Sequence, residues 1–464
     1  MSNDATQADT ATFPAPQDSI SRTGRWLALM VAFFGWYFAG MLLSTQQLAM
    51  RPAAINLLSR TGVIERIPFD ALSQRAADKT RQQPLSPAEQ TQLKSWQGST
   101  QRWFAFFQTA FLCGAAAGGL IFGRVGDRFG RSKALGAAVV CYAAFSGVTY
   151  FVTTPEQLLV SWFLAALGVG GTWPNGVALV AEIWSGLSRP MISGIIGMAA
   201  NVGLFMMSTI ATFVAVTPDS WRWMMAAGFA TVILGALILL SVPESPRWLA
   251  SRQSRGDSGK PAPSVAEVFR SPHLGITCVG ILLATVPILG GSGAANWMIP
   301  WADQVATSNP LLKAEIGQAR ALTGCIGSLL GGWIATLIGR RCSYFLTSLG
   351  ALICAEYIYC ALQPTDPSFL WWVAGLGFFS GIYFGWLPLV LPELFPTSVR
   401  STGAGVCFNF GRVTTAGIVF LAGSLTSYFA GDYARIGQIM SGIFAIGLLA
   451  ILFTPDSSRR QLAE

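Results

Sequence analysis

Twelve long apolar stretches divide this chain of 464 residues, and each is long enough to cross a lipid bilayer as an α-helix. The apolar core of a bilayer is about 30 Å thick, which requires roughly 20 residues of helix. Charged residues make up only 11% of the chain, too few to cover the surface of a soluble protein of this length. We therefore predict an all-α membrane protein with twelve transmembrane helices. The expected helices occupy residues 26–50, 103–122, 134–152, 158–181, 191–214, 223–242, 274–299, 321–338, 344–362, 369–391, 402–425 and 436–454.

Three short patterns occur once in each half of the sequence, about 210 residues apart. Each copy follows a long apolar stretch, so the charged residues fall in corresponding loops. Such repeats predict two pseudo-symmetric six-helix bundles, the construction of proteins that move a solute by alternating access. The first pattern is the loop from Gly123 to Arg131, which corresponds to the loop from Gly332 to Arg341. The second is a Glu seven residues before an Arg, as in Glu182 with Arg189 and in Glu393 with Arg400. The third is the pair of segments that begin at Pro243 and Pro455.

The distribution of lysine and arginine predicts how the helices are oriented. Loops on one side hold many basic residues, whereas the short loops on the other side hold four. Because the basic side of a membrane protein faces the cytoplasm, we expect both termini there, in a multi-pass protein of the plasma (inner) membrane. The four residues expected in short outer loops are Arg222, Lys313, Arg320 and Arg435.

The same pattern divides the chain into two bundles with polar connections. Residues 1–24 are polar and lack the features of a signal peptide, so we expect a disordered cytoplasmic tail. The loop 51–102 is long and basic, and we expect short helices in it that cap the outer mouth. The remaining parts are a first bundle at 25–250, which includes that loop, a cytoplasmic linker at 251–272, a second bundle at 273–455 and a short tail at 456–464.

Composition argues against several other functions. His273 is the only histidine and the eight cysteines lie in or beside apolar stretches, so we expect no metal site, no cofactor and no catalytic triad. The net charge of +8 is dispersed over loops, which favours membrane orientation over nucleic-acid binding. The chain is not expected to be an enzyme. Its expected partners are the lipid bilayer and a small solute, and one chain is expected to hold a complete path as a monomer.

Three motifs resemble those of the major facilitator superfamily. The segment Gly123-x-x-x-Asp127-Arg128-x-Gly130-Arg131 resembles the signature loop between its second and third helices. The segment that begins Pro243-Glu244-Ser245 is similar to the sugar-porter signature after helix six. The segment from Pro392 to Arg400 resembles the sequence before helix eleven in the sugar-porter and metabolite:proton symporter branches. The resemblance implies secondary transport, in which the two bundles rock about a central site.

The charged residues of these loops are candidates for a cytoplasmic gate. Asp127 and the repeated glutamates can pair with arginines of other loops, and such pairs would hold the inner mouth closed. The alternative is that the charges only set the topology. In the second half Thr336 and Leu337 stand where the signature has Asp and Arg, so we expect the first half to contribute more. The candidate gate residues are Asp127, Arg128, Arg131, Glu182, Arg189, Glu244, Arg247, Glu393 and Arg400.

Two ionisable residues lie within apolar stretches, where insertion costs about 2.5–3.5 kcal/mol each. Arg412 lies near the middle of helix eleven, and its guanidinium suits a carboxylate of the solute. Alternatively, Arg412 forms a structural pair with a carboxylate such as Glu356. Glu356 is also a candidate for proton coupling, although ninth helices of the superfamily usually lie outside the central cavity. The first helix has no acid and Thr172 stands where some relatives have Glu, so facilitated diffusion and coupling to another ion stay open.

Polar and aromatic residues within the helices complete the candidate binding site. Amides and aromatic rings together suit a hydroxylated ring or an aromatic acid. For each aromatic residue, packing is the alternative. We predict a secondary transporter of a small organic solute that bears a carboxylate; a neutral-sugar porter, a drug exporter and a transporter-like receptor remain alternatives. The candidate substrate-binding residues are Arg412, Asn409, Tyr37, Gln108, Trp173, Asn175, Asn201, Asn296 and Trp297.

Overall fold

The structure is a computed structural model that describes residues 21–77, 84–184, 189–245, 248–249, 265–307, 309–396, 399–429 and 431–454. These residues form helices joined by turns, without strands in the ranges given. Eleven helical segments in this part of the chain are long and apolar enough to cross a membrane. A further long helix, α13 (Leu312–Leu337), includes the charged residues Lys313, Glu315 and Arg320. The predicted all-α architecture of twelve membrane helices is confirmed.

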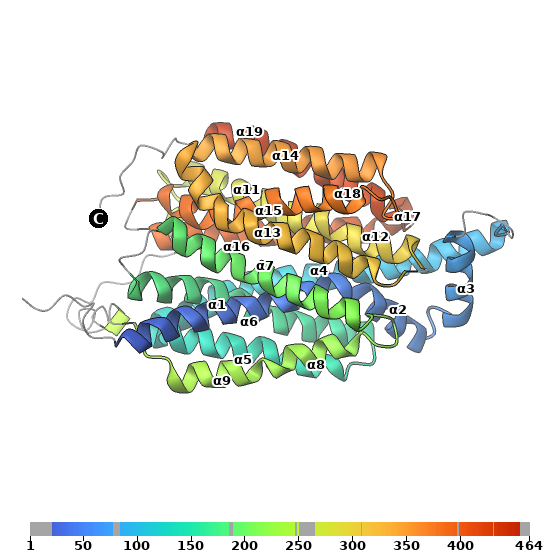
Figure 1. The fold of residues 1–464 in the computed structure, drawn as a ribbon, viewed down its shortest axis with the longest axis horizontal. Coiled ribbons are helices and arrows are strands. Elements are labelled where there is room, and N and C mark those ends of the chain that lie inside the picture. The colour runs from blue at the N-terminus through green and yellow to red at the C-terminus, as the bar shows by residue number, and fades with distance from the viewer. Residues whose placement is uncertain are drawn as a thin grey trace, which may run out of the picture.

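The first six spans form one half of the bundle and the last six the other (Figure 1). The first half contains α1 (Arg22–Leu48), α4 (Pro87–Phe129), α5 (Arg131–Tyr150), α6 (Pro155–Ile183), α7 (Arg189–Phe213) and the pair α8 (Arg222–Ala230) and α9 (Val232–Ser241). Two short helices, α2 (Met50–Arg60) and α3 (Arg66–Ala77), lie between α1 and α4.

The second half begins after the short η2 (Val265–Phe269). Its seventh span consists of α11 (Leu274–Leu289), η3 (Gly290–Ala294), η4 (Ala295–Trp297) and α12 (Met298–Val305). Then follow α13, α14 (Arg340–Ala361), α15 (Phe369–Glu393) and α16 (Arg400–Ser424), and after α17 (Thr426–Phe429) the last span of α18 (Tyr433–Ser441), α19 (Ile443–Ala450) and η5 (Ile451–Phe453). The halves pack against each other mainly through α4 with α16 and α7 with α13.

Glycine allows close helix packing at equivalent places in the two halves. A Cβ atom at Gly118 of α4 would lie 1.9 Å from the carbonyl oxygen of Leu167 in α6. A Cβ atom at Gly327 of α13 would lie 2.1 Å from the carbonyl oxygen of Phe378 in α15. No side chain fits at such distances, so small residues set the spacing of these helices.

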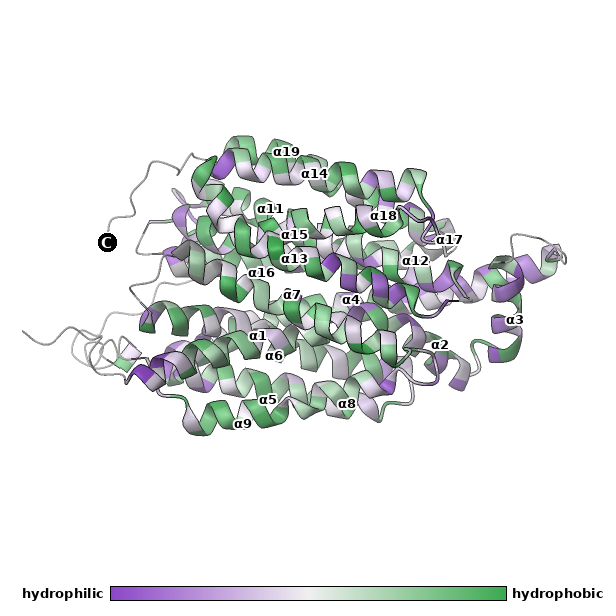
Figure 2. Ribbon diagram, in the orientation of Figure 1, coloured by the Kyte–Doolittle hydropathy of each residue, from purple (hydrophilic) through white to green (hydrophobic). Residues whose placement is uncertain are grey.

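The two ends of the bundle differ. The first span begins and the last span ends at one end, which we call the termini end (Figure 1). The opposite end, the cap end, bears α2, α3 and the first turns of α4, and hydrophilic residues gather at both ends (Figure 2). The cap has its own small apolar core. That core consists of Ile55, Leu58, Ile64, Phe69, Leu72, Leu93 and Trp96.

Candidate functional site

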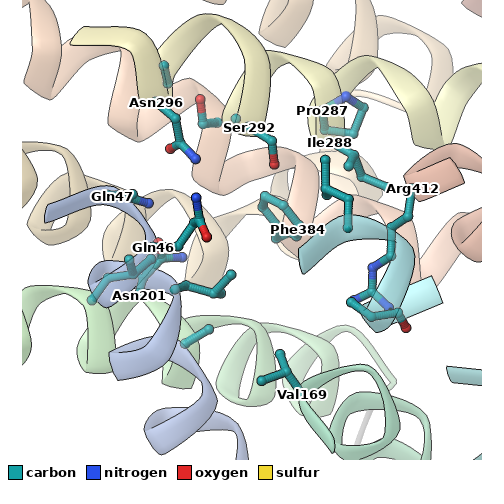
Figure 3. A pocket seen from close by; sticks show the side chains of 18 of the residues that line it. Gln46, Gln47, Val169, Asn201, Pro287, Ile288, Ser292, Asn296, Phe384 and Arg412 are labelled. Atoms are coloured by element: carbon teal, nitrogen blue, oxygen red, sulfur yellow. The ribbon is translucent and has the colours of Figure 1, made fainter. Parts of the chain in front are cut away.

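A cavity of about 150 Å³ lies between the two halves. In the first half it is lined by α1, α4, α6 and α7, and in the second by the broken seventh span, α13, α15 and α16. Figure 3 shows side chains from both halves that point into this space. The aromatic residues Trp36 and Trp173, whose ring centroids lie 5.0 Å apart, form part of its wall together with Phe384 and Phe408.

The seventh span is interrupted where it meets the cavity. Pro287 lies inside α11 and cannot donate a backbone hydrogen bond, and the chain continues as one turn of π-helix and one of 3₁₀-helix before α12. The interruption brings the backbone of Ser292 to the cavity, where its carbonyl oxygen accepts a hydrogen bond from Nε2 of Gln108 in α4. Non-helical backbone at membrane depth is tolerated where it lines such a cavity. The sequence analysis missed this break, although Pro287 and the following glycines signal it.

Arg412 of α16 lines the cavity and its side chain is only 8% exposed. One guanidinium nitrogen donates to the carbonyl oxygen of Ala115 in α4, at 3.1 Å, and to Oδ1 of Asn409, at 3.3 Å. The guanidinium also lies over the ring of Phe408, 4.6 Å from its centroid. Among the described residues no carboxylate lies within ion-pair distance of Arg412. The structural pair of Arg412 with Glu356 that the sequence suggested is therefore not formed. The carboxylate of Glu356 accepts a hydrogen bond from the thiol of Cys360.

A second arginine, Arg320, also lines the cavity. The sequence analysis placed it in an outer loop, because the apolar pattern of the eighth helix begins only at residue 321. That placement is wrong: α13 begins at Leu312, so Arg320 lies more than two turns inside the helix. Its guanidinium donates to Oδ1 of Asn296 at 3.0 Å. Arg320, too, has no carboxylate within ion-pair distance among the described residues.

Polar side chains of the cavity wall offer unused hydrogen-bonding atoms. In the described part of the chain, Nε2 of Gln46, Oε1 of Gln108 and Oγ of Ser380 are buried without a hydrogen-bond partner. Asn201 donates to Oγ of Ser328 at 2.9 Å. Buried polar atoms usually have partners, so the three unsatisfied atoms suit the polar groups of a bound solute. None of the described residues that line the cavity carries a carboxylate.

The structure brings some of the candidate binding residues to the cavity and leaves others elsewhere. Gln108, Trp173, Asn201, Asn296 and Arg412 line it. The cavity wall also contains residues that are not among the candidate substrate-binding residues given above: Gln46, Gln47, Ser292, Arg320, Ser380 and Phe384.

Four candidates, Asn409, Asn175, Trp297 and Tyr37, are absent from the cavity wall. Oδ1 of Asn409 accepts a hydrogen bond from Arg412. Asn175 donates to the carbonyl oxygens of Phe122 and Gly171, a contact that ties α6 to α4. The indole of Trp297 is fully buried between Phe104 and Tyr433.

The remaining residues singled out in the sequence also lie away from the solute space. Tyr37 packs against Phe34 and Phe38. Glu356 is partly exposed on α14, which contributes no described residue to the cavity wall. Its role in coupling stays a prediction.

The candidate gate residues form ion pairs within each half. At the termini end Arg131 contacts Asp127 at 2.7 Å and Glu182 at 3.5 Å, while Arg340 contacts Glu393 at 3.2 Å. The pairs of Arg131 with Glu182 and of Arg340 with Glu393 occupy equivalent places in the repeat, after Gly130 and Gly339. Asp127 was expected to pair with another loop, but its partner belongs to its own.

Besides Glu244, four gate candidates remain: Arg128, Arg189, Arg247 and Arg400. Arg128 is exposed and lies over the ring of its neighbour Phe129. Arg189 begins α7, but its side chain, like all of Arg247, lies outside the described residues. Arg400 begins α16 and is partly buried.

Glu244 caps the N-terminus of α5. Its carboxylate accepts hydrogen bonds from the backbone N–H groups of Arg131, at 2.8 Å, and Ser132, at 3.2 Å, and from the hydroxyl of Ser132 at 2.9 Å. A carboxylate is stabilised there because unpaired N–H groups and the helix dipole make a helix N-terminus positive. Glu244 therefore connects the end of α9 to the signature loop.

A charge contact between described residues of the two halves lies at the cap end. Asp303 of α12 forms ion pairs with Arg51 of α2 and with Lys313 of α13, the latter at 2.6 Å. Arg51 belongs to the first half and the other two residues to the second. Their side chains are 7%, 15% and 3% exposed for Arg51, Asp303 and Lys313, so the network is largely withdrawn from solvent. The sequence analysis missed it because it assigned Arg51 and Lys313 to loops.

Two six-span halves with a polar cavity between them define a membrane transporter of the alternating-access class. The family model of the major facilitator superfamily matches residues 25–416, and the chain belongs to this family.

Several curated proteins are similar to the chain over most of its length. It is 28% identical over 373 residues to a probable 4-methylmuconolactone transporter of Cupriavidus pinatubonensis, which covers 78% of this chain and 83% of that protein. It is 25% identical over 353 residues to the cis,cis-muconate transport protein of Acinetobacter baylyi, covering 74% and 83%. Among solved structures, the fold is similar to a D-xylose-proton symporter with a TM-score of 0.66 and 18% identity, covering 94% and 99%.

Proposed function

We propose that this transporter moves a small organic metabolite that bears a carboxylate. The observation that supports this most is the cavity with two guanidinium groups, Arg320 and Arg412, and no carboxylate among its described lining residues. An uncompensated positive charge in a membrane protein favours an anionic ligand, and the arginine fork matches a carboxylate. The relatives named for muconolactone and muconate transport agree with this substrate class.

The membrane orientation and the oligomeric state form part of the proposal. The basic loops at the termini end support a cytoplasmic location of both termini in the inner membrane, with the cap outside. The cavity is built from residues of one chain, which supports function as a monomer. We further propose that the regions 25–250 and 273–455 rock against each other as units, with 51–102 as the outer segment of the first.

A neutral-sugar porter is the alternative favoured by the sugar-porter signature and by the structural likeness to xylose symporters. The cavity amides, such as Gln46 and Gln108, would suit sugar hydroxyls as well as carboxylates. A neutral solute, however, leaves Arg320 and Arg412 without counter-charge. This difference makes net charge the property to test.

Uptake into proteoliposomes distinguishes the two functions. The panel contains a labelled aromatic acid, a hexuronate, sialic acid, glucose and xylose, each with and without an inward proton gradient. We expect uptake of at least one acid and none of the neutral sugars. Liposomes without protein control for weak acids that cross lipid unaided.

The results separate substrate class from coupling. Uptake of glucose or xylose in place of acids would overturn the proposal. If acid uptake accelerates with the gradient, transport is proton-coupled, and Glu356→Gln tests whether that carboxylate is responsible. Acid uptake that ignores the gradient in the wild type would assign the protein to facilitated diffusion or to another ion.

A further inference from the structure

The cavity holds two separate cationic groups, each supported by a different part of the protein. Arg412 is fixed by the carbonyl oxygen of Ala115 in α4 and by Asn409. Arg320 is fixed by Asn296 in the broken seventh span. Figure 3 shows Arg412 and Asn296 on different sides of the cavity, with Ser292 and Ile288 between them. The two guanidinium groups therefore have separate hydrogen-bond partners, which belong to different elements.

Charge balance then constrains the ligand. A guanidinium has five N–H donors, and the structure shows one nitrogen of each arginine bonded to neutral oxygens. A buried charge is stabilised by a partner of opposite charge with good hydrogen-bond geometry. A solute with one carboxylate would neutralise one arginine and leave the other uncompensated, whereas a solute with two would neutralise both.

The wall of the cavity is partly apolar. It includes Ile288, Phe384 and Phe408, and the apolar edges of Trp36 and Trp173. Such a wall suits a carbon skeleton, and the unsatisfied atoms of Gln46, Gln108 and Ser380 suit polar groups attached to it. We infer that the substrate is a dicarboxylate, its two carboxylates held by Arg320 and Arg412. This inference rests on the proposed function and names the substrate class for the same site.

Binding of a matched series tests the inference on the purified full-length protein in nanodiscs. The probes are adipate, its monomethyl ester and its dimethyl ester, which have two, one and no carboxylates on the same carbon chain. Calorimetric titration should show adipate binding at least about tenfold more tightly than the monoester, because a hydrogen bond to a charged group contributes about 1.5–3 kcal/mol. The dimethyl ester should not bind.

Substitutions assign each carboxylate to one arginine. Arg320→Gln and Arg412→Gln should each reduce the affinity for adipate to about that of the monoester, and the double variant should bind neither. Arg320→Lys and Arg412→Lys keep the charge and serve as second variants should a glutamine variant fail to fold. Size-exclusion chromatography monitors folding.

Two contrary results have different meanings. Equal affinity of the wild type for adipate and its monoester, or a preference for adipate that survives both glutamine variants, would overturn the inference while leaving an acid transporter. Binding of glucose or xylose with no binding of any acid, the uptake panel included, would instead overturn the proposed function.

Discussion

At the scale of single residues, Gly130 shows why the signature loop requires glycine. Its φ is +115° with ψ at 151°, a conformation that other residues rarely adopt. A Cβ atom there would also lie 1.9 Å from Oε2 of Glu244, the carboxylate that caps α5. Gly339, at the equivalent place in the second half, has a φ of +90°. The glycine thus permits both the turn and the cap.

We expect Gly130→Ala to destabilise the protein by at least about 1–3 kcal/mol, the usual cost of such a backbone conformation. Thermal unfolding of the purified protein in detergent measures the effect as a lower midpoint. Gly123→Ala is the matched control, because a Cβ atom at Gly123 meets nothing within 4 Å and alanine favours helix. Equal midpoints for the two variants would show that neither the turn nor the contact with Glu244 matters.

A polar residue that stands alone in an apolar stretch can be located from sequence, while its role in binding stays a prediction. Arg412 was predicted on this ground, and it lines the cavity. Arg320 was missed because Lys313, Glu315 and Gln318 precede it and make the start of α13 resemble a loop. A lone hydropathy pattern cannot distinguish a polar turn of helix inside a protein from a polar loop outside it. Tertiary contacts such as that of Arg320 with Asn296 provide the distinction.

At the scale of elements, helix α12 connects the two halves through Asp303. The contact joins α2 of the first half to α12 and α13 of the second, at the cap end. In contrast, each ion pair described at the termini end joins two residues of the same half: Arg131 with Asp127 and Glu182 in the first, and Arg340 with Glu393 in the second. This arrangement ties the two halves together at the cap end.

We expect Asp303→Asn to open the cap end, because Arg51 and Lys313 would then lose their shared counter-charge, a loss of about 3–5 kcal/mol for a buried pair. The measurement is the labelling rate of Ser292→Cys by an impermeant maleimide applied from the cap side, in a variant without the eight native cysteines. Labelling should be faster in the presence of Asp303→Asn.

Asp219→Asn is the control for this experiment. Asp219 forms an exposed ion pair with Arg66, and both residues belong to the first half at the same end. An exposed pair contributes about 0–1 kcal/mol, so labelling should stay at the wild-type rate. If Asp303→Asn and Asp219→Asn labelled equally, the Asp303 network would have no part in closure.

Apolar patterns in the sequence predict where a membrane helix lies, but they do not predict breaks inside it. The expected helix at 274–299 was found, but as four short elements instead of one, because Pro287 and the glycines after it interrupt the hydrogen-bond ladder. Local breaks of this kind depend on whether neighbouring helices can satisfy the freed backbone groups. Gln108 does so for Ser292, and nothing in the sequence places these two residues together.

At the scale of the whole molecule, the two halves meet along α7 and α13 as well as α4 and α16. Near the cap end a Cβ atom at Gly317 of α13 would lie 3.3 Å from Cβ of Ser208 in α7. That separation is close to the range of about 3.5–4.5 Å found in disulfides.

The twofold architecture itself was predictable, since the repeated motifs and apolar stretches both encode it.

We expect the pair Ser208→Cys and Gly317→Cys, in a variant without the native cysteines, to form a disulfide on oxidation and to stop transport. The covalent bond would keep the cap end closed, so the site could no longer alternate between the two sides. Uptake into proteoliposomes should return on reduction. Each single variant is a control and should transport equally with and without oxidant. Full transport by the oxidised, cross-linked pair would contradict rocking of the halves at this contact.

The length of α4 has a practical consequence. Its 43 residues correspond to about 64 Å of continuous helix, roughly twice the thickness of the bilayer core. Helix α4 belongs to the first half but projects from it into the cap, where α3 packs against it (Figure 1). A tilt of about 10° would therefore displace its far end by about 10 Å. A small rotation of the first half within the membrane therefore moves the cap end of α4 by a larger distance. A spectroscopic label at that end of α4 would make the rotation measurable outside the membrane.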